Sequence, residues 1–547
     1  MTRYRLFEFL AAIAMLLTLP GAVQRPADPA QIAVLMVGGG PSRQYNQVAI
    51  ESNMRYVGRL LPSGATVTSL FADGDAGASS VEYASSDRAL GARVLSLALD
   101  RVTEDDPTIK FRQPAIGRNI DGSNRKSSID SAFGRLRSFA VANPTEPVLI
   151  YFTGHGSPNR RNIEDNYYDT WNESRGLSVR ALAAEIARLP ATTPVTIVMV
   201  QCFSGAFGNL LFDNGDPSAP QVRRDLVGFF ATVEDRVAAG CTTAVNEAEY
   251  HDFTSYFFAA LTGRDRVGRK VEGADYNHDG RVGMDEAFCY TLIHDQSIDV
   301  PVCTSDVFLR RFVPMSDAAV TATRFKDLLK WARPAQRAAL SALQKELKLR
   351  GPSRFQIAYN EAVKRLGKNA GMRSTTDPGA IRSLNRQEQS ASRYVLAQWP
   401  SLQHPDAPEA KPELDDALTA LTDQAVSGRW KKLLDADDRV EISEKQGEAS
   451  EIADSKLLRF IRLAKSVVLA HRLQTAGTPA AQAAFNRLSN LEARSLLPKA
   501  GPFATTVKTS ADGNGAEQTA MLLRELRTAT LRCCAESGAH GRGASWF

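Results

Sequence analysis

The segment VLIYFTGHGSP, residues 148–158, is an apolar run that ends in a histidine flanked by glycines. A second segment, VTIVMVQCFSG at residues 195–205, has a similar pattern, in which a cysteine follows the apolar run. Short apolar runs bounded by turn residues are typical of strands buried on both faces. The two segments therefore predict two strands of one parallel sheet, with His155 and Cys202 at their carboxyl ends.

The remainder of the first 312 residues alternates between strand and helix patterns. This alternation predicts an α/β fold, a mainly parallel sheet with helices on both faces. Residues 74–126 are rich in Gly, Ser, Asp and Arg, and are expected to form an insertion with long loops. Further strands are expected at 32–37, 66–71 and 226–233, and helices at 47–61, 127–141 and 178–189, the last capped by Ser178.

Strand patterns stop after about residue 314, and only helical patterns follow. The chain is therefore expected to divide into an α/β domain at 30–312 and a mostly α-helical region at 315–547 that carries no recognisable chemistry. Residues 369–382 and 499–516 are polar and show no helix or strand pattern, so they are expected to be irregular. Helices are expected at 322–331, 335–349, 355–366, 414–434, 457–473 and 479–497.

The N-terminus has the pattern of a signal peptide. Arg3 and Arg5 precede an apolar run at 9–19, which is too short to span a bilayer. A signal peptide at 1–23 predicts a secreted or periplasmic protein with no stable membrane span after its removal. A single N-terminal membrane anchor is the alternative.

The composition narrows the possible partners and cofactors. A net charge of +5 over 547 residues, with both signs mixed, does not favour nucleic acid. None of the seven histidines forms a pair with metal-ligand spacing on a helix, which argues against a zinc hydrolase, and no organic cofactor is expected. In an exported chain, Cys289 and Cys303 are the expected disulfide pair, because they flank one short segment.

Cys202 and His155 have the chemistry of a nucleophile and its base. A thiol attacks as the thiolate, and a nearby imidazole both promotes that form and transfers protons. The structural alternative is a small buried cysteine and a satisfied polar histidine, which is common at strand ends. The residues alone leave both interpretations open.

Several segments resemble the clan of cysteine peptidases that includes legumains, caspases, metacaspases and gingipains. The likeness is closest to legumain-like, caspase-family proteins of bacteria, and it covers roughly residues 32–312. Segments 148–158 and 198–207 resemble the histidine and cysteine strands of legumains. Residues 229–241 with 251–257 resemble the specificity strand and the helix after it, and 38–47 resemble the loop after the first strand.

The resemblance implies a caspase-like fold and an exported cysteine endopeptidase that acts on a peptide or protein substrate. Cys202 would attack the scissile carbonyl, His155 would transfer protons, and the N–H groups of Gly156 and Cys202 would form the oxyanion hole. Asn46 is the expected orienting residue for the imidazole. The candidates for substrate binding are Arg43, Asp235 and Asp252.

Two other functions remain open for the same fold. The first is a catalytically inactive binding or scaffold protein. The second is a peptide ligase or transpeptidase, because an amine can resolve an acyl-enzyme in place of water.

Residues 275–286, DYNHDGRVGMDE, match a calcium-binding EF-hand loop. Gly280 occupies the turn position and Val282 the apolar one. One isolated loop of this kind predicts a structural clamp for one Ca²⁺ instead of a sensor. The expected ligands are Asp275, Asn277, Asp279, the Arg281 carbonyl and Glu286.

Overall fold

The structure is a computed structural model, and it describes residues 31–84, 90–99, 109–368, 377–405 and 407–500. The proposed signal peptide at 1–23 and two of the six cysteines, Cys533 and Cys534, lie outside these ranges. Among the helices of the described ranges, none combines the length and the apolar character needed to cross a bilayer.

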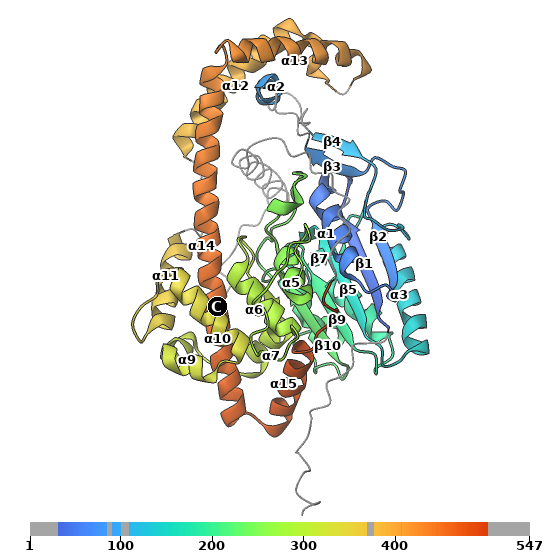
Figure 1. The fold of residues 1–547 in the computed structure, drawn as a ribbon, viewed down its shortest axis with the longest axis vertical. Coiled ribbons are helices and arrows are strands. Elements are labelled where there is room, and N and C mark those ends of the chain that lie inside the picture. The colour runs from blue at the N-terminus through green and yellow to red at the C-terminus, as the bar shows by residue number, and fades with distance from the viewer. Residues whose placement is uncertain (1–30, 85–89, 100–108, 369–376, 406, 501–547) are drawn as a thin grey trace, which may run out of the picture.

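A six-stranded sheet in the order β11-β10-β9-β5-β1-β2 forms the centre of the α/β domain (Figure 1). Five strands are parallel, and the edge strand β11 is antiparallel to β10. The predicted α/β class with a mainly parallel sheet is confirmed. The strands are β1 (Ala33–Gly39), β2 (Thr66–Phe71), β5 (Val148–Gly154), β9 (Val195–Met199), β10 (Leu226–Phe230) and β11 (Val302–Cys303).

Helices cover both faces of this sheet because its strands are apolar on both sides. Along β1, Val34 and Met36 face one hydrophobic core, and Leu35 and Val37 face the other. The first core also contains α1 (Val48–Leu60), α5 (Phe253–Thr262), α6 (Met284–His294) and α7 (Thr304–Phe312), and the second contains α3 (Lys126–Ala142) and α4 (Val179–Ala187). Ser178 caps α4 as predicted, since its side chain accepts the N–H of Ala181 at 3.2 Å.

Short elements surround the carboxyl edge of the sheet. A small antiparallel sheet lies there in the order β6-β7-β8, and 3₁₀ turns follow β1 and β9. The bounds are η1 (Arg43–Tyr45), β6 (Gly156–Ser157), η2 (Ile163–Asp165), β7 (Tyr167–Tyr168), β8 (Leu177–Ser178), η3 (Ser204–Leu211), η4 (Asp213–Gly215) and η5 (Glu247–Glu249).

The insertion at 74–126 has more regular structure than its composition predicts. Its strands β3 (Val81–Ala84) and β4 (Ile109–Arg112) pair antiparallel, and α2 (Leu90–Leu99) lies between them in sequence. Helix α2 packs away from the sheet, against helices of the C-terminal region. The sequence could not show this, because the partners of α2 lie some 300 residues further along the chain.

The region after residue 314 is mostly helical in its described part, as predicted. The prediction at 414–434 is wrong in detail, because the chain breaks at Gly428 in a left-handed conformation. A helix at 378–398 was not predicted. The elements are α8 (Asp317–Thr321), α9 (Phe325–Trp331), α10 (Pro334–Glu346), α11 (Arg354–Lys368), α12 (Pro378–Gln398), η6 (Pro400–Gln403), η7 (Pro408–Ala410), α13 (Lys411–Val426), α14 (Lys431–Ala476) and α15 (Pro479–Glu492).

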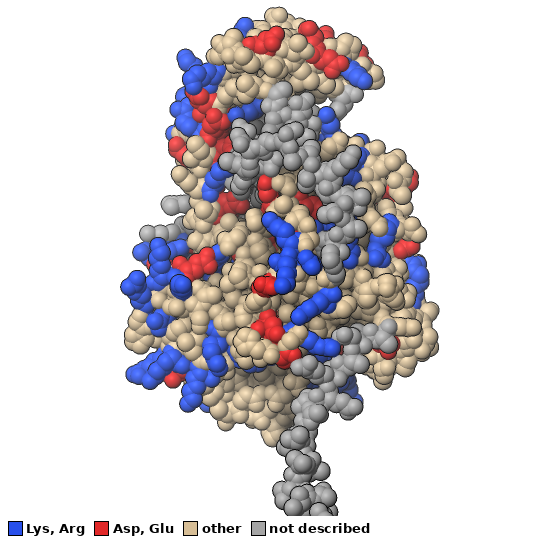
Figure 2. Space-filling model, in the orientation of Figure 1, with Lys and Arg blue, Asp and Glu red and all other residues tan. Residues whose placement is uncertain are grey.

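Helix α14 joins two separate hydrophobic cores (Figure 1). Its second half packs into the core of the α/β domain through residues such as Leu457, Phe460 and Ile461. Its first half, with α2, α12 and α13, forms a distal bundle with a core of its own. Ion pairs between Arg93 on α2 and Asp437 and Asp438 on α14 add to this contact. On the face seen in Figure 2, basic and acidic side chains are interspersed.

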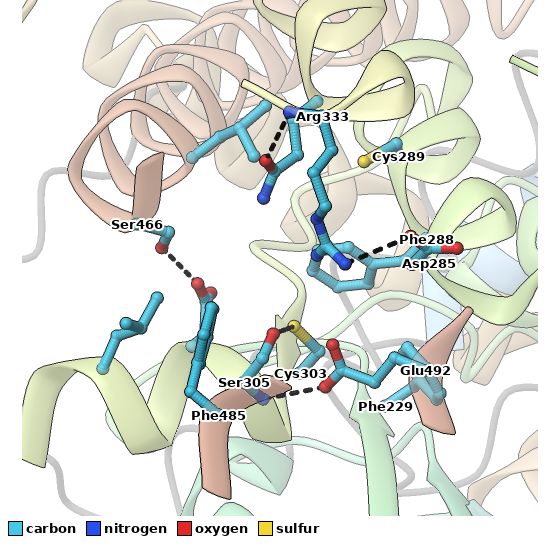
Figure 3. Close-up of a pocket in the computed structure, with 14 residues that line it drawn as sticks. Phe229, Asp285, Phe288, Cys289, Cys303, Ser305, Arg333, Ser466, Phe485 and Glu492 are labelled. Atoms are coloured by element: carbon cyan, nitrogen blue, oxygen red, sulfur yellow. Dashed lines mark hydrogen bonds and ion pairs between the residues drawn. The ribbon is translucent and has the colours of Figure 1, made fainter. Parts of the chain in front are cut away.

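The predicted disulfide between Cys289 and Cys303 is wrong. All four cysteines in the described ranges, Cys202, Cys241, Cys289 and Cys303, are free thiols. Cys289 and Cys303 line a cavity of about 20 Å³ between α6, α7 and the C-terminal helices (Figure 3). A cavity of that size holds about one water molecule, so it is not a substrate pocket.

Candidate active site

His155 and Cys202 leave neighbouring strands at the same edge of the sheet. β5 and β9 pair in parallel, with Phe152 opposite Met199. His155 follows the end of β5 directly, and Cys202 lies three residues after the end of β9. The backbones stay in contact beyond the strands, because a Cβ added at Gly156 would collide with the carbonyl oxygen of Cys202. The structure thus places the backbones of Gly156 and Cys202 side by side at the sheet edge where His155 also lies.

A backbone N–H group faces the Cys202 sulfur. The N–H of Ala238 donates to Sγ at 3.3 Å, and Sγ lies 3.8 Å from the carbonyl oxygen of the same residue. A donor at this position stabilises negative charge on the sulfur. Ala238 belongs to the loop after β10, so this loop contacts the candidate nucleophile directly.

The chain bends sharply directly after Cys202. Phe203 is left-handed, at φ 60° and ψ 18°, which is unusual for a bulky residue. Gly205 follows in close contact with the backbone after β10, where a Cβ would lie 2.7 Å from the carbonyl oxygen of Thr232. The bend and the glycine together place Cys202 at the start of η3, against the loop after β10.

A chain of polar contacts orients the His155 ring. Its Nε2 lies 2.9 Å from Oε1 of Gln47, and Nε2 of Gln47 donates to the carboxylate of Glu82 at 2.9 Å. Because the amide nitrogen of Gln47 faces Glu82, its oxygen faces the ring, and His155 Nε2 is the donor. The three side chains are buried, which favours one fixed geometry.

The His155 ring is neutral at neutral pH. Burial lowers its pKa from 6.5 to about 4, although a hydrogen bond to the Tyr45 backbone acts in the opposite direction. A neutral imidazole can accept a proton, but a pKa of about 4 is well below the value near 7 that suits a general base.

Asn46, the predicted orienting residue, holds the backbone instead. Its Oδ1 accepts the N–H of Gly40 at 3.1 Å, and its Nδ2 donates to the carbonyl of Ser80 at 2.8 Å. These bonds join the loop after β1 to the segment before β3. The contact to the imidazole comes from the next residue, Gln47, which the sequence could not distinguish because its partner Glu82 is 35 residues away.

The three predicted substrate-binding residues have different surroundings. Arg43 is exposed, with its guanidinium 3.8 Å from the centre of the Phe111 ring. Asp235 is half-buried on the loop after β10, and burial, with the nearby charge of Glu234, raises its pKa.

Asp252 is a buried structural residue. Its carboxylate caps α5 through the N–H of Ser255 at 2.7 Å and pairs with Arg266 at 3.0 Å. Burial opposes ionisation, but Arg266 and the bonds from Ser255 lower the pKa of Asp252 overall. The carboxylate is therefore engaged within the fold.

Two further titratable groups adjoin the site. The N–H of Asp169 donates to the His155 carbonyl at 3.0 Å, and burial raises the Asp169 pKa to about 6. Cys241 has its Sγ 3.8 Å from the carbonyl of Gly154, and burial together with the nearby Cys202 raises its pKa. Neither residue is among the predicted site residues, because each is brought to the site by the packing of segments that are separate in the sequence.

The loop at 275–286 has the turn geometry of the predicted calcium loop. Gly280 has φ 88°, and the Asp275 carboxylate accepts the N–H of Gly280 at 2.9 Å. Glu286 accepts the N–H groups of Tyr276 and Asn277 at 2.9 Å and of Gly283 at 3.0 Å. Oxygen ligands suit Ca²⁺. Within the described ranges, however, no three His, Cys, Asp or Glu side chains converge closely enough to hold a metal.

Comparison with known proteins adds little to this geometry. No family model and no curated protein matches the chain. Among solved structures, the chain is similar to the protein GSU0716 from Geobacter sulfurreducens, a structural-genomics target. The match has 12% identity and a TM-score of 0.27, and covers 50% of this chain and 92% of that one.

Proposed function

We propose that this chain is a cysteine endopeptidase of the caspase and legumain type, with Cys202 as nucleophile and His155 as base. The observation that carries the proposal is the pairing of β5 with β9, which puts both side chains at one sheet edge. The Ala238 N–H directed at the sulfur and the Gln47 contact to the ring support it.

In the proposed reaction, the Cys202 sulfur attacks the carbonyl carbon of a peptide bond, and its proton passes to His155. The imidazole then protonates the leaving amine, and a thioester remains on Cys202. Water deprotonated by His155 hydrolyses that thioester and restores the thiol. The N–H groups of Gly156 and Cys202 stabilise the oxyanion, and each such donor contributes roughly 100–1,000-fold in rate.

Thiol labelling and peptide cleavage together test this proposal. Cys202 should react with iodoacetamide faster than Cys289 and Cys303, whose burial raises their pKa values. His155→Ala should slow the labelling of Cys202, and both His155→Ala and Cys202→Ala should abolish cleavage of a peptide library. If Cys202 labels no faster and no peptide is cut, the inactive scaffold becomes the better account. Product mass separates hydrolysis from ligation.

We also propose export, on the pattern of residues 1–23. N-terminal sequencing of secreted or periplasmic protein should give a first residue between about 22 and 31. A cytosolic protein that retains Met1 would contradict export.

Calcium binding at 275–286 is a further part of the proposal, supported by the oxygen donor set and the turn at Gly280. Titration calorimetry with Ca²⁺ should show one site in the wild type and none in Asp275→Ala. Glu272→Ala is the matched control, because Glu272 is exposed and lies just before the loop. A melting temperature that chelator does not change would contradict a structural role.

A further inference from the structure

A second cavity, of about 370 Å³, lies between the α/β domain and the helical region. Its walls come from η3, from the end of α7 and the chain after it, and from the second half of α14. This volume is within the range of small-molecule sites. No residue of the proposed Cys–His centre lines it, so it is a different site.

Basic side chains dominate the wall of this cavity. Four of its lining residues are cationic, Arg310 and Arg311 on α7 and Arg462 and Lys465 on α14, whereas two are acidic, Glu164 and Glu234. Two of the cations have an acidic partner: Arg310 lies 3.3 Å from Asp306, and Lys465 lies 2.8 Å from Asp317.

The donor capacity of the two central arginines is only partly used. Nε of Arg310 and Nε of Arg462 are buried, and neither has a hydrogen-bond partner in the described part of the chain. Unsatisfied buried donors are rare, and each one calls for an explanation. A guanidinium presents its N–H groups in a planar fork that suits the oxygens of phosphate or carboxylate.

The same cations repel one another in the absence of a ligand. Burial and the nearby charge of Arg310 lower the pKa of Arg462 to about 10, although the carboxylates of Asp306, Glu234 and Asp235 act in the opposite direction. Burial also lowers the pKa of Lys465, and Arg310 and Arg462 add to that effect. A bound anion would relieve this repulsion.

We propose that this cavity binds a small phosphate-type oxyanion, held mainly by Arg310, Arg462 and Lys465. The ligand would also touch two segments next to the Cys–His centre. Gly205 in η3 is three residues after Cys202, and Glu234 is on the loop whose Ala238 faces the sulfur. The cavity therefore adjoins two segments that also contact or contain Cys202.

The test is calorimetry and thermal unfolding with pyrophosphate as the probe, on the full chain. This test needs no peptidase activity, so its outcome is independent of the proposed function. Pyrophosphate should bind one site and raise the melting temperature of the wild type, and sodium chloride at equal ionic strength should not. Arg462→Gln and Lys465→Gln should each weaken binding by about 10–100-fold, the value of a charged hydrogen bond.

Lys431→Gln is the matched control, since it removes one exposed charge from the same helix and should leave the affinity unchanged. Without the probe, Arg462→Gln should be at least as stable as the wild type, because it removes one of the repelling charges. A purely structural Arg462 would give the opposite result. Absence of binding to the wild type, or equal binding by Arg462→Gln, overturns the proposal.

Free phosphate compounds and lipid headgroups share this chemistry. Vesicles of phosphatidylcholine with and without phosphatidic acid distinguish the two sources. Retention of the chain only on phosphatidic acid, lost in Arg462→Gln, identifies a headgroup, whereas binding of pyrophosphate without retention identifies a soluble ligand.

Discussion

The guanidinium of Arg459 on α14 donates to the backbone carbonyl oxygen of Asp299 at 2.7 Å. The Asp299 carboxylate in turn accepts the N–H of Ala239 at 2.7 Å, one residue beyond the N–H that faces Cys202. Arg459 also pairs with Asp295 at 3.2 Å, and both side chains are fully buried. The helical region therefore holds the loop that contacts the candidate nucleophile.

Replacement of Arg459 should destabilise the protein strongly. Arg459→Met leaves Asp295 as an uncompensated buried charge, so the free energy of unfolding should fall by about 3–5 kcal/mol in urea titrations. Arg487→Met is the control, because Arg487 is exposed and its ion pair with Asp225 should contribute less than about 1 kcal/mol. Equal losses of unfolding free energy in the two variants would show that the buried pair of Arg459 and Asp295 contributes no more than a surface ion pair.

Gln47 should affect catalysis more than stability. Gln47→Ala removes the contact that orients the His155 ring. General acid–base catalysis contributes roughly 100–10,000-fold to the rate, so kcat for peptide cleavage should fall by part of that factor. Gln47→Glu places a carboxylate beside the ring and should move the acid limb of the pH profile to higher pH.

Asn46→Ala is the comparison variant for Gln47→Ala, because the Asn46 side chain forms its hydrogen bonds to the backbone groups of Gly40 and Ser80. It should lower stability by about 1–3 kcal/mol. If Asn46→Ala leaves stability unchanged and abolishes cleavage as completely as Gln47→Ala, Asn46 has the orienting role after all.

The buried His155 predicts a specific pH dependence of stability. The folded ring has a pKa of about 4, whereas in the unfolded chain the value is 6.5. Between these values the unfolded chain binds more protons, so this group destabilises the fold increasingly as pH falls from about 6.5 to about 4. Urea unfolding of the wild type and His155→Gln should diverge in that interval. Parallel curves would contradict the low pKa.

Glu492 predicts the opposite dependence. Its carboxylate accepts the N–H of Ser305 at 2.8 Å beside the small cavity of Figure 3, and burial raises its pKa from 4.5 to about 6. The folded state binds more protons between these values, so the stability contributed by this group falls as pH rises from about 4.5 to about 6.

Glu492→Gln keeps an acceptor oxygen and removes this titration. Its stability relative to the wild type should therefore rise over the same pH interval, as measured by urea unfolding. A difference between the two proteins that stays constant with pH would contradict the raised pKa.

Local sequence patterns determined most of the α/β domain. Apolar runs next to glycines located five of the six sheet strands, and helical periodicity located α1, α3 and α4. The pattern failed along α14, where residues 435–456 are highly charged and have little apolar periodicity. That stretch is helical because the distal bundle and the α/β domain hold its two ends.

Local residue patterns were enough to predict the class of fold, the strand-end positions of His155 and Cys202, and the turn at Gly280. These features depend on residues close together in the chain, where propensity and periodicity act. Three features became visible in the three-dimensional structure alone: the contact of Gln47 with the imidazole, the free thiols of Cys289 and Cys303, and the cavity that Arg310 and Arg462 share. Each of these depends on which distant segments pack together, and packing is set by the fold as a whole instead of by any local pattern.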